Sequence, residues 1–126
     1  MWSPDGSQVV FRSNRGGKYD LYRKASNGAG EDELLLNTDQ DKVPNSWSRD
    51  GRLLIYYSVD PKTNVDLWAL PLEGDRKPIP LLRTEFQEAF GAVSPDERWL
   101  AYLSSESGNN EIYIRPFAPD GSTCAG

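Results

Sequence analysis

The chain has 126 residues, the length of one ordinary domain, so it forms either one compact unit or a piece of a larger one. Its formal charge is −5 with acidic and basic residues interspersed, and the basic stripe needed to grip a nucleic-acid backbone is absent. The sequence contains no histidine and only one cysteine, Cys124, which excludes histidine-dependent catalysis, histidine-ligated zinc sites and an internal disulfide.

No stretch of the chain approaches membrane-spanning length, and its start, Met1-Trp2-Ser3, lacks the basic and apolar runs of a targeting segment. We therefore expect a chain with no membrane span and no nucleic-acid partner. Because the sequence shows neither a metal-ligand spacing nor a Gly-rich phosphate loop, we also expect no cofactor.

The first predicted unit opens with a Ser-Pro-Asp-Gly turn directly after an aromatic residue, Trp2. Pro4 presets the φ angle of the first corner position, Asp5 can bond back to the nearby backbone, and Gly6 adopts the left-handed conformation without steric cost. This is the sequence chemistry of a tight turn.

Three runs rich in β-branched, aromatic or leucine residues follow this turn, and such runs are typical of strands. We expect strands at 8–13, 20–25 and 32–37. The polar segments at 14–18 and 37–43 are predicted to be a loop and the connection to the next unit.

The second unit repeats the order of the first. Trp47 precedes a turn that contains Asp50 and Gly51, and arginine stands where the first turn has proline. The expected strands are 53–58, 66–71 and 77–82, with a loop at 60–64 and a polar connection at 83–89.

The third unit contains Pro95 and Asp96, followed by predicted strands at 99–104 and 111–116 with a polar loop at 105–110. Glu97 stands where the earlier copies have glycine, and a non-glycine residue with positive φ costs on the order of 1 kcal/mol. The turn therefore either changes its type or tolerates the strain.

The repeat has a fixed length. Trp2, Trp47 and Val93 recur about every 45 residues, and so do Asp20, Asp66 and Glu111, which is the period of propeller blades. We predict an all-β fold: a β-propeller segment of about three four-stranded antiparallel blades, at about 1–43, 44–88 and 89–126. The residues assigned to this architecture are Trp2, Pro4, Asp5, Gly6, Asp20, Trp47, Asp50, Gly51, Asp66, Pro95, Asp96 and Glu111.

The repeated motif resembles the WD40-like propeller repeats of the TolB type: an aromatic residue, Ser-Pro-Asp-Gly, a strand ending in serine, a polar loop, then Asp-Leu-Tyr or Asp-Leu-Trp. The resemblance covers nearly the whole chain. Segments 66–82 and 94–117 most resemble the propeller regions of bacterial serine/threonine kinase-associated proteins. In those proteins the propeller is a sensor or interaction module beside a separate catalytic domain.

The resemblance also implies a ring of six or more blades and a periplasmic or other extracytoplasmic location. Three blades would be half of a six-bladed ring, so we expect completion either by homodimerisation or by further blades of a parent chain. An isolated arc would leave the aromatic and leucine side chains of its flanking faces in water.

Several side chains allow a structural or a functional interpretation. The acids that start the second strands can form a carboxylate ring for a cation or a basic peptide, but repeat anchors more often accept hydrogen bonds within the fold. Asp39 and Asp41 can offer oxygens to calcium, yet their spacing lacks the ligand number and turn glycine of calcium loops. The tryptophans can stack on sugars or bases, and packing between blades explains them better.

Function is therefore expected on loops that gather at one face of the ring, and their mixture of charges suits a protein or peptide ligand. We expect a non-catalytic interaction or sensor scaffold. The alternatives are a propeller that gates substrate for a prolyl-oligopeptidase-like hydrolase and a propeller that binds a sugar or small molecule. The candidate interaction residues are Arg15, Lys18, Asp39, Asp41, Lys62, Asn64, Glu85, Glu88 and Asn109.

Overall fold

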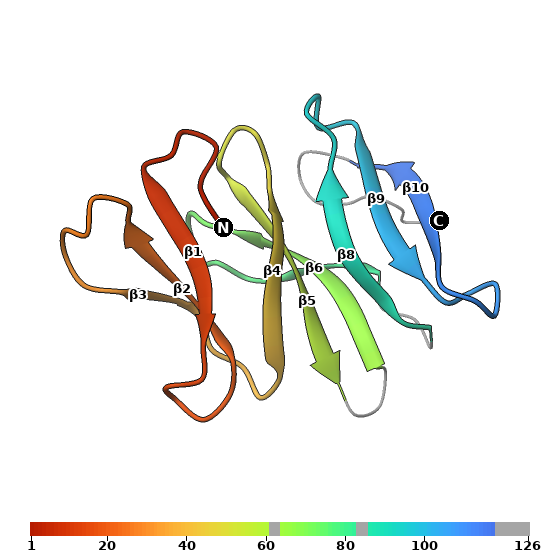
Figure 1. The fold of residues 1–126 in the computed structure, drawn as a ribbon, viewed down its shortest axis with the longest axis horizontal. Helices are drawn as coiled ribbons and strands as arrows, with labels where there is room; N and C mark the ends of the chain where they lie inside the picture. Colours follow the sequence, from red (N-terminus) through yellow and green to blue (C-terminus); the bar gives the residue numbers. More distant parts are fainter. Residues whose placement is uncertain (61–63, 83–85, 118–126) are drawn as a thin grey trace.

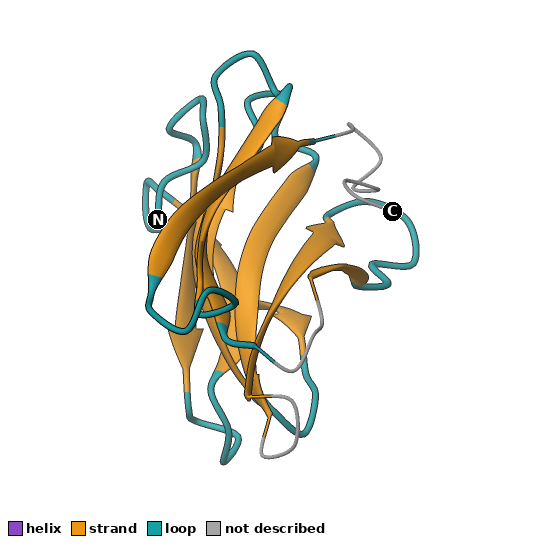
Figure 2. Ribbon diagram, turned by 90° about the vertical axis from the view of Figure 1, so that its right-hand side faces the viewer, coloured by secondary structure: helices purple, strands orange, loops and turns teal. Residues whose placement is uncertain are grey.

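The computed structural model describes residues 1–60, 64–82 and 86–117, and within these ranges the regular elements are strands alone (Figure 2). All strand pairs are antiparallel. The prediction of an all-β fold is confirmed. The strands are β1 (Gln8–Ser13), β2 (Asp20–Ala25), β3 (Glu33–Leu36), β4 (Asp41–Trp47), β5 (Leu53–Asp60), β6 (Asn64–Pro71), β7 (Ile79–Leu82), β8 (Glu88–Val93), β9 (Trp99–Ser104) and β10 (Glu111–Pro116).

The strands form three sheets that stand side by side in chain order (Figure 1). Blade 1 contains β1, β2 and β3, blade 2 contains β4 to β7, and blade 3 contains β8, β9 and β10. The middle sheet has the full four strands. In blade 1 the inner position is held by an isolated bridge between Trp2 and Val9. This confirms the prediction of successive antiparallel propeller blades.

The inner strands begin earlier than the sequence indicated. β4 starts at Asp41 and β8 starts at Glu88, so the connections predicted at 37–43 and 83–89 include the first residues of strands. Lys42 and Glu88 are polar, so the sequence places them in loops, but both are buried between blades. A polar side chain at a buried strand position breaks the apolar pattern by which strands are recognised.

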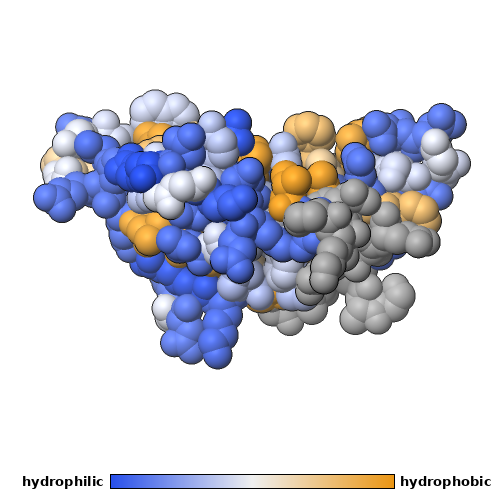
Figure 3. Space-filling model, turned by 90° about the horizontal axis from the view of Figure 1, so that it is seen from below, coloured by the Kyte–Doolittle hydropathy of each residue, from blue (hydrophilic) through white to orange (hydrophobic). Residues whose placement is uncertain are grey.

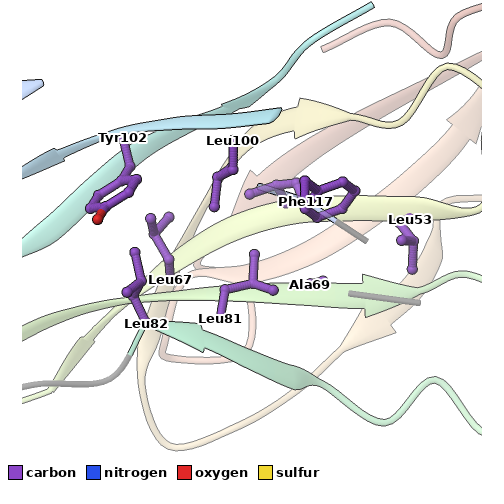
Figure 4. Close-up of a cluster of buried hydrophobic side chains, with 9 residues drawn as sticks. Leu53, Leu67, Ala69, Leu81, Leu82, Leu100, Tyr102 and Phe117 are labelled. Carbon is purple, nitrogen blue, oxygen red and sulfur yellow. The ribbon is translucent and has the colours of Figure 1, made fainter. Parts of the chain in front are cut away.

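The core lies between the blades. Leu54 and Ile55 are neighbours on β5, but they point to opposite faces of the sheet and belong to different hydrophobic clusters. Leu54 packs with Val10 and Leu21 of blade 1, whereas Ile55 packs with Leu100 of blade 3. Figure 4 shows the second cluster, in which side chains of β9 meet those of β6 and β7. A sheet covered on both faces explains the continuous apolar run at 53–57.

The strand directions separate the connecting segments into two faces. The turns before β1, between β4 and β5, and between β8 and β9 lie at the upper edge of Figure 1, and we call this edge the turn face. The β1–β2 and β9–β10 loops and the β3–β4 connection lie at the lower edge, the loop face. The two sets of segments can therefore serve different purposes.

Candidate functional site

The three turns on the turn face have the same hydrogen bonds. In the first, the Ser3 hydroxyl donates to the Asp5 carboxylate over 2.7 Å, and the Gln8 amide donates to the Ser3 hydroxyl over 3.0 Å. The Ser3 amide also donates to the Gln8 carbonyl at the start of the following strand over 2.8 Å. The equivalent hydroxyl–carboxylate bonds, Ser48 to Asp50 and Ser94 to Asp96, are both 2.6 Å long.

These bonds change the acidity of the turn carboxylates. Hydrogen bonds from the Ser7 side chain and backbone, then from Ser3, lower the pKa of Asp5 from its ordinary value of 3.8 to about 2. Bonds donated chiefly by Ser48 and Ser94 lower the pKa values of Asp50 and Asp96. The turn itself therefore uses all three carboxylates as ionised acceptors.

Glu97 keeps the turn type of its glycine counterparts. Its φ angle is 60°, against 75° at Gly6 and 79° at Gly51, and its amide donates to the Ser94 carbonyl over 2.8 Å. The turn therefore tolerates the strain of a positive φ at Glu97 and does not change its type. Ser94 donates to Asp96 and accepts from the Trp99 amide, as the equivalent serines do in the other two turns, and these bonds hold Glu97 in this conformation.

Asp20, the buried acid of blade 1, forms an ion pair with a lysine of blade 2. The Lys42 ammonium on β4 donates to the Asp20 carboxylate over 2.6 Å, and both side chains are at most 2% exposed. The same ammonium donates to the backbone carbonyl of Gln40 over 2.5 Å. Asp20 therefore joins blades 1 and 2. Its role is structural, the second of the two interpretations given for the repeated acids.

The three repeated acids do not form a carboxylate ring open to solvent. They occupy equivalent positions, since Asp20 pairs with Ser13, Asp66 with Ser58 and Glu111 with Ser104. Asp66 is buried like Asp20, whereas Glu111 is exposed on blade 3. Burial of the first two removes them from a solvent-facing site.

Four of the predicted interaction residues have exposed side chains on the loop face. Arg15, Lys18, Asp39 and Asn109 are exposed there, and Figure 3 shows this edge as mostly hydrophilic, with separate apolar patches. The Arg15 guanidinium bonds to Asp32 over 2.9 Å.

Other candidates have structural positions or lie outside the described residues. The Asp41 carboxylate accepts the Tyr19 amide over 2.9 Å, and Glu88 is buried at the start of β8. These two residues are therefore corrected from loop-face candidates to parts of the inner strands. Asn64 begins β6, but its side chain is not among those described. Lys62 and Glu85 lie outside the described residues.

The tryptophans divide into two groups. Trp47 packs at the first junction and donates its indole N–H to the Gly51 carbonyl over 2.9 Å, and Trp68 stacks on Tyr56 in the same cluster. Trp2 and Trp99 are 64% and 47% exposed. Packing between blades therefore accounts for the first two tryptophans only.

The face of blade 3 that points away from blade 2 carries exposed apolar side chains that sequence reasoning did not assign to individual residues. Ile112 and Ile114 are each 67% exposed, and Ile114 lines an apolar hollow of about 460 Å³ with Trp99 and Ala101. The alternation of apolar and other residues in Glu111–Pro116 was the available signal, because alternate side chains share one sheet face.

The described part of the chain contains no gathering of three or more acidic or cysteine side chains suited to a metal ion. Nor do its residues form any helix with the length and apolar character that crossing a membrane requires.

Solved structures with the same arrangement of blades include two TolB proteins. A protein assigned as TolB from Agrobacterium tumefaciens matches 96% of this chain with a TM-score of 0.79 and 26% identity. TolB from Acinetobacter baumannii matches 97% with a TM-score of 0.75 and 19% identity. The chain has the TolB-type β-propeller fold.

This chain covers 42% of the Agrobacterium chain and 30% of the Acinetobacter chain, so it spans less than half of either TolB-type protein. A prolyl endopeptidase structure matches 98% of this chain with a TM-score of 0.67 and 14% identity, and the chain covers 20% of that enzyme. At this identity the match concerns the fold alone. No protein-family model and no curated protein sequence matches the chain.

Proposed function

We propose that the chain is a non-catalytic propeller scaffold that binds a protein or peptide partner on its loop face. The observation that supports this most directly is the internal use of the repeated carboxylates. Asp5, Asp50 and Asp96 accept hydrogen bonds within their turns, and Asp20 pairs with Lys42. With no histidine in the sequence, the usual activated nucleophiles have no base.

The loop face supplies the chemistry for such a partner. Lys18 provides positive charge, Asp39 provides negative charge and Asn109 provides an amide. The Arg15 guanidinium is exposed beside them and is paired with Asp32 of its own blade. A face with both signs suits a polypeptide that carries complementary charges, whereas a polyanion would need a basic patch. Rigid blades hold these loops at fixed positions, as expected of a recognition surface.

A peptide selection tests this function. Peptides selected on the wild-type chain should bind less well to a Lys18→Glu, Asp39→Lys double variant, because the variant reverses both charges and preserves net charge. Glu31→Lys, an exposed substitution on the β2–β3 loop at the turn face, should leave binding unchanged. Selected peptides that lose affinity only for the Glu31→Lys variant would contradict the proposal. Binding can be measured by fluorescence anisotropy.

We further propose that the propeller acts as a sensor or interaction module beside a separate catalytic domain. The resemblance of residues 66–82 and 94–117 to kinase-associated propellers supports this assignment. The domain content of the gene that encodes the chain provides the test. A gene that encodes a hydrolase domain would favour substrate gating instead.

We also propose that a second copy of the chain completes the ring. Three blades and an exposed apolar face on blade 3 support this assembly. Light scattering over a dilution series should give twice the chain mass of 14.1 kDa. A monomer at every concentration would contradict this part of the proposal and leave peptide binding on the loop face as a separate question.

A further inference from the structure

A hollow of about 260 Å³ lies between blades 1 and 2. The connection from β3 to β4, at the loop face, forms one wall, and the side of blade 2 that faces blade 1 forms the other (Figure 1). Its lining includes Thr38, Asp39, Gln40, Tyr56, Ser58 and Trp68. Since two described blades flank it, the hollow exists whether or not another blade adjoins either end of this arc.

The blade 2 wall of this hollow is aromatic. Trp68 is half-buried and stacks in parallel on the buried Tyr56, with the two ring centroids 6.4 Å apart. The Trp68 indole N–H donates to the Ser58 hydroxyl over 2.8 Å, so the ring has a fixed orientation. Among aromatic rings, an indole attracts a cation to its face most strongly. A positively charged group is therefore the kind of ligand that this wall favours.

The wall formed by the β3–β4 connection carries a carboxylate. Asp39 is exposed, and across the described ranges its side chain takes part in no hydrogen bond or ion pair. The backbone on either side of it is fixed, because the Lys42 ammonium donates to the Thr38 carbonyl over 3.4 Å and to the Gln40 carbonyl over 2.5 Å. Lys42 is itself paired with Asp20, so Asp39 is available to a cation of another molecule. A loop that is already ordered loses little conformational entropy when it binds.

The other two blades show which cation such an aromatic pair accepts. In blade 1 the Arg15 guanidinium lies 4.4 Å from the centroid of the Tyr22 ring and binds Asp32 over 2.9 Å. In blade 3 the Arg115 guanidinium lies 5.9 Å from the centroid of the Tyr102 ring and donates to its hydroxyl over 2.7 Å. Both rings belong to stacked pairs at the position of the blade 2 pair. A guanidinium between an aromatic ring and a carboxylate is therefore an arrangement that this fold already contains.

We propose that this hollow receives an arginine side chain of a polypeptide partner, with the guanidinium against the Trp68 ring and its charge paired with Asp39. This inference rests on the proposed binding of a polypeptide at the loop face and names the side chain that is recognised. Arginine fits better than lysine, because its planar group can lie flat on a ring and donate to a carboxylate at the same time. The net charge of −5 also favours a cationic partner.

An NMR titration with N-acetyl-arginine amide tests the site, because this probe carries the side chain without charged termini. The indole N–H signal of Trp68 and the amide signal of Asp39 should shift together as the probe is added. The indole signals of Trp2 and Trp99 should shift little, although both rings are more exposed to solvent. N-acetyl-citrulline amide, which has nearly the same shape and no charge, should bind at least about tenfold more weakly, and N-acetyl-lysine amide about threefold more weakly.

Two variants test the two walls separately. Asp39→Asn should weaken binding of the arginine probe about threefold or more, and Trp68→Leu should abolish it. Glu31→Gln is the matched control, because it makes the same change from carboxylate to amide at an exposed site on the turn face and should leave binding unchanged. The remaining indole signals report whether each variant is folded. If Trp68→Leu disturbs the packing, Asp39→Asn and the citrulline probe still decide.

The outcomes separate this site from the proposed function. Equal affinity for the arginine and citrulline probes, or equal shifts at Trp2, Trp68 and Trp99, would overturn the guanidinium site. Selected loop-face peptides that keep their affinity when each arginine is replaced by citrulline would overturn it too, while leaving peptide binding intact. A probe that binds beside Trp68 while no selected peptide depends on Lys18 or Asp39 would overturn the proposed function but not the guanidinium site.

Discussion

At the residue scale, the Ser-Asp turns make stability depend on the ionisation of a few carboxylates. The pKa of Asp5 is lowered to about 2 in the folded chain, so its contribution is complete above about pH 4 and is lost as the pH falls toward 2. We expect the melting temperature of the wild type to fall across this window. Asp5→Asn should be less stable at neutral pH and should lose less stability on acidification, as thermal melts at several pH values would show. Parallel pH profiles for the two chains would contradict this role of Asp5.

Glu97 provides a test of backbone strain. Because Glu97 has a φ angle of 60° in a turn where Gly6 has 75°, Glu97→Gly should stabilise the chain by about 1 kcal/mol. Gly6→Ala should destabilise it by a similar amount, since a Cβ there meets no atom within 4 Å and only the backbone conformation is penalised. Urea unfolding measures both changes. Destabilisation by Glu97→Gly would mean that the glutamate side chain contributes more than the strain costs.

At the element scale, the ion pair between β2 and β4 joins two blades. Lys42→Met leaves the Asp20 carboxylate buried without its cation and should cost about 3–5 kcal/mol in the free energy of unfolding. Adding Asp20→Leu to this variant should recover part of the loss, because the uncompensated charge is then gone. Chemical denaturation of the two single variants and the double variant provides the measurement. A double variant that loses the sum of the two single losses would show that the pair is not coupled.

Gly91 sets the approach of β8 to blade 2. A Cβ at this position would lie 3.0 Å from the Ile55 side chain and 3.1 Å from that of Leu67, so Gly91→Ala should cost about 1–3 kcal/mol. Gly16→Ala is the matched control, since its Cβ would lie 3.7 Å from the nearest atom, the Asp20 carboxylate. Urea unfolding should separate the two variants. Similar stabilities would show that the junction can relax around an added methyl group.

The sequence predicted the local elements well and the long-range pairings poorly. The positions of β1, β2, β9 and β10 follow from runs of β-branched and aromatic residues, and these strands have the bounds predicted for them. The start of β4 did not follow, because Asp41 and Lys42 look like loop residues until Asp20 is known to lie opposite. Local patterns specify turns and strands, whereas a buried charge is explained only by its partner from another blade.

The same distinction applies to the candidate site. The turn acids could be assigned from Ser-Pro-Asp-Gly alone, since their hydrogen bonds are made within the turn. Asp41 and Glu88 read as loop residues in the sequence, because neither the bond that Asp41 accepts from the Tyr19 amide of blade 1 nor the burial of Glu88 leaves a mark in the residues near them. Exposure of Ile112 depends likewise on which blades surround it.

At the scale of the whole molecule, the blades contact one another in sequence order, so damage at one junction should act independently of damage at the other. Val10→Ala in the first cluster should cost roughly 1–3 kcal/mol, and Ile55→Val in the second about 0.5–1.5 kcal/mol. The double variant should show the sum within about 0.5 kcal/mol. A large deviation in denaturant unfolding would show that blade 2 transmits strain between its two faces.

The outer rim of blades 1 and 2 has a consequence for behaviour at high concentration. The rim strands β3 and β7 have four residues each, β7 includes Pro80, and the Glu33 carboxylate on β3 binds Arg76 of the next blade over 2.6 Å. Short rims that contain proline and charge are poor templates for adding strands from another molecule. Crowded solutions of this chain should therefore favour discrete assemblies over fibrils that grow from these rims.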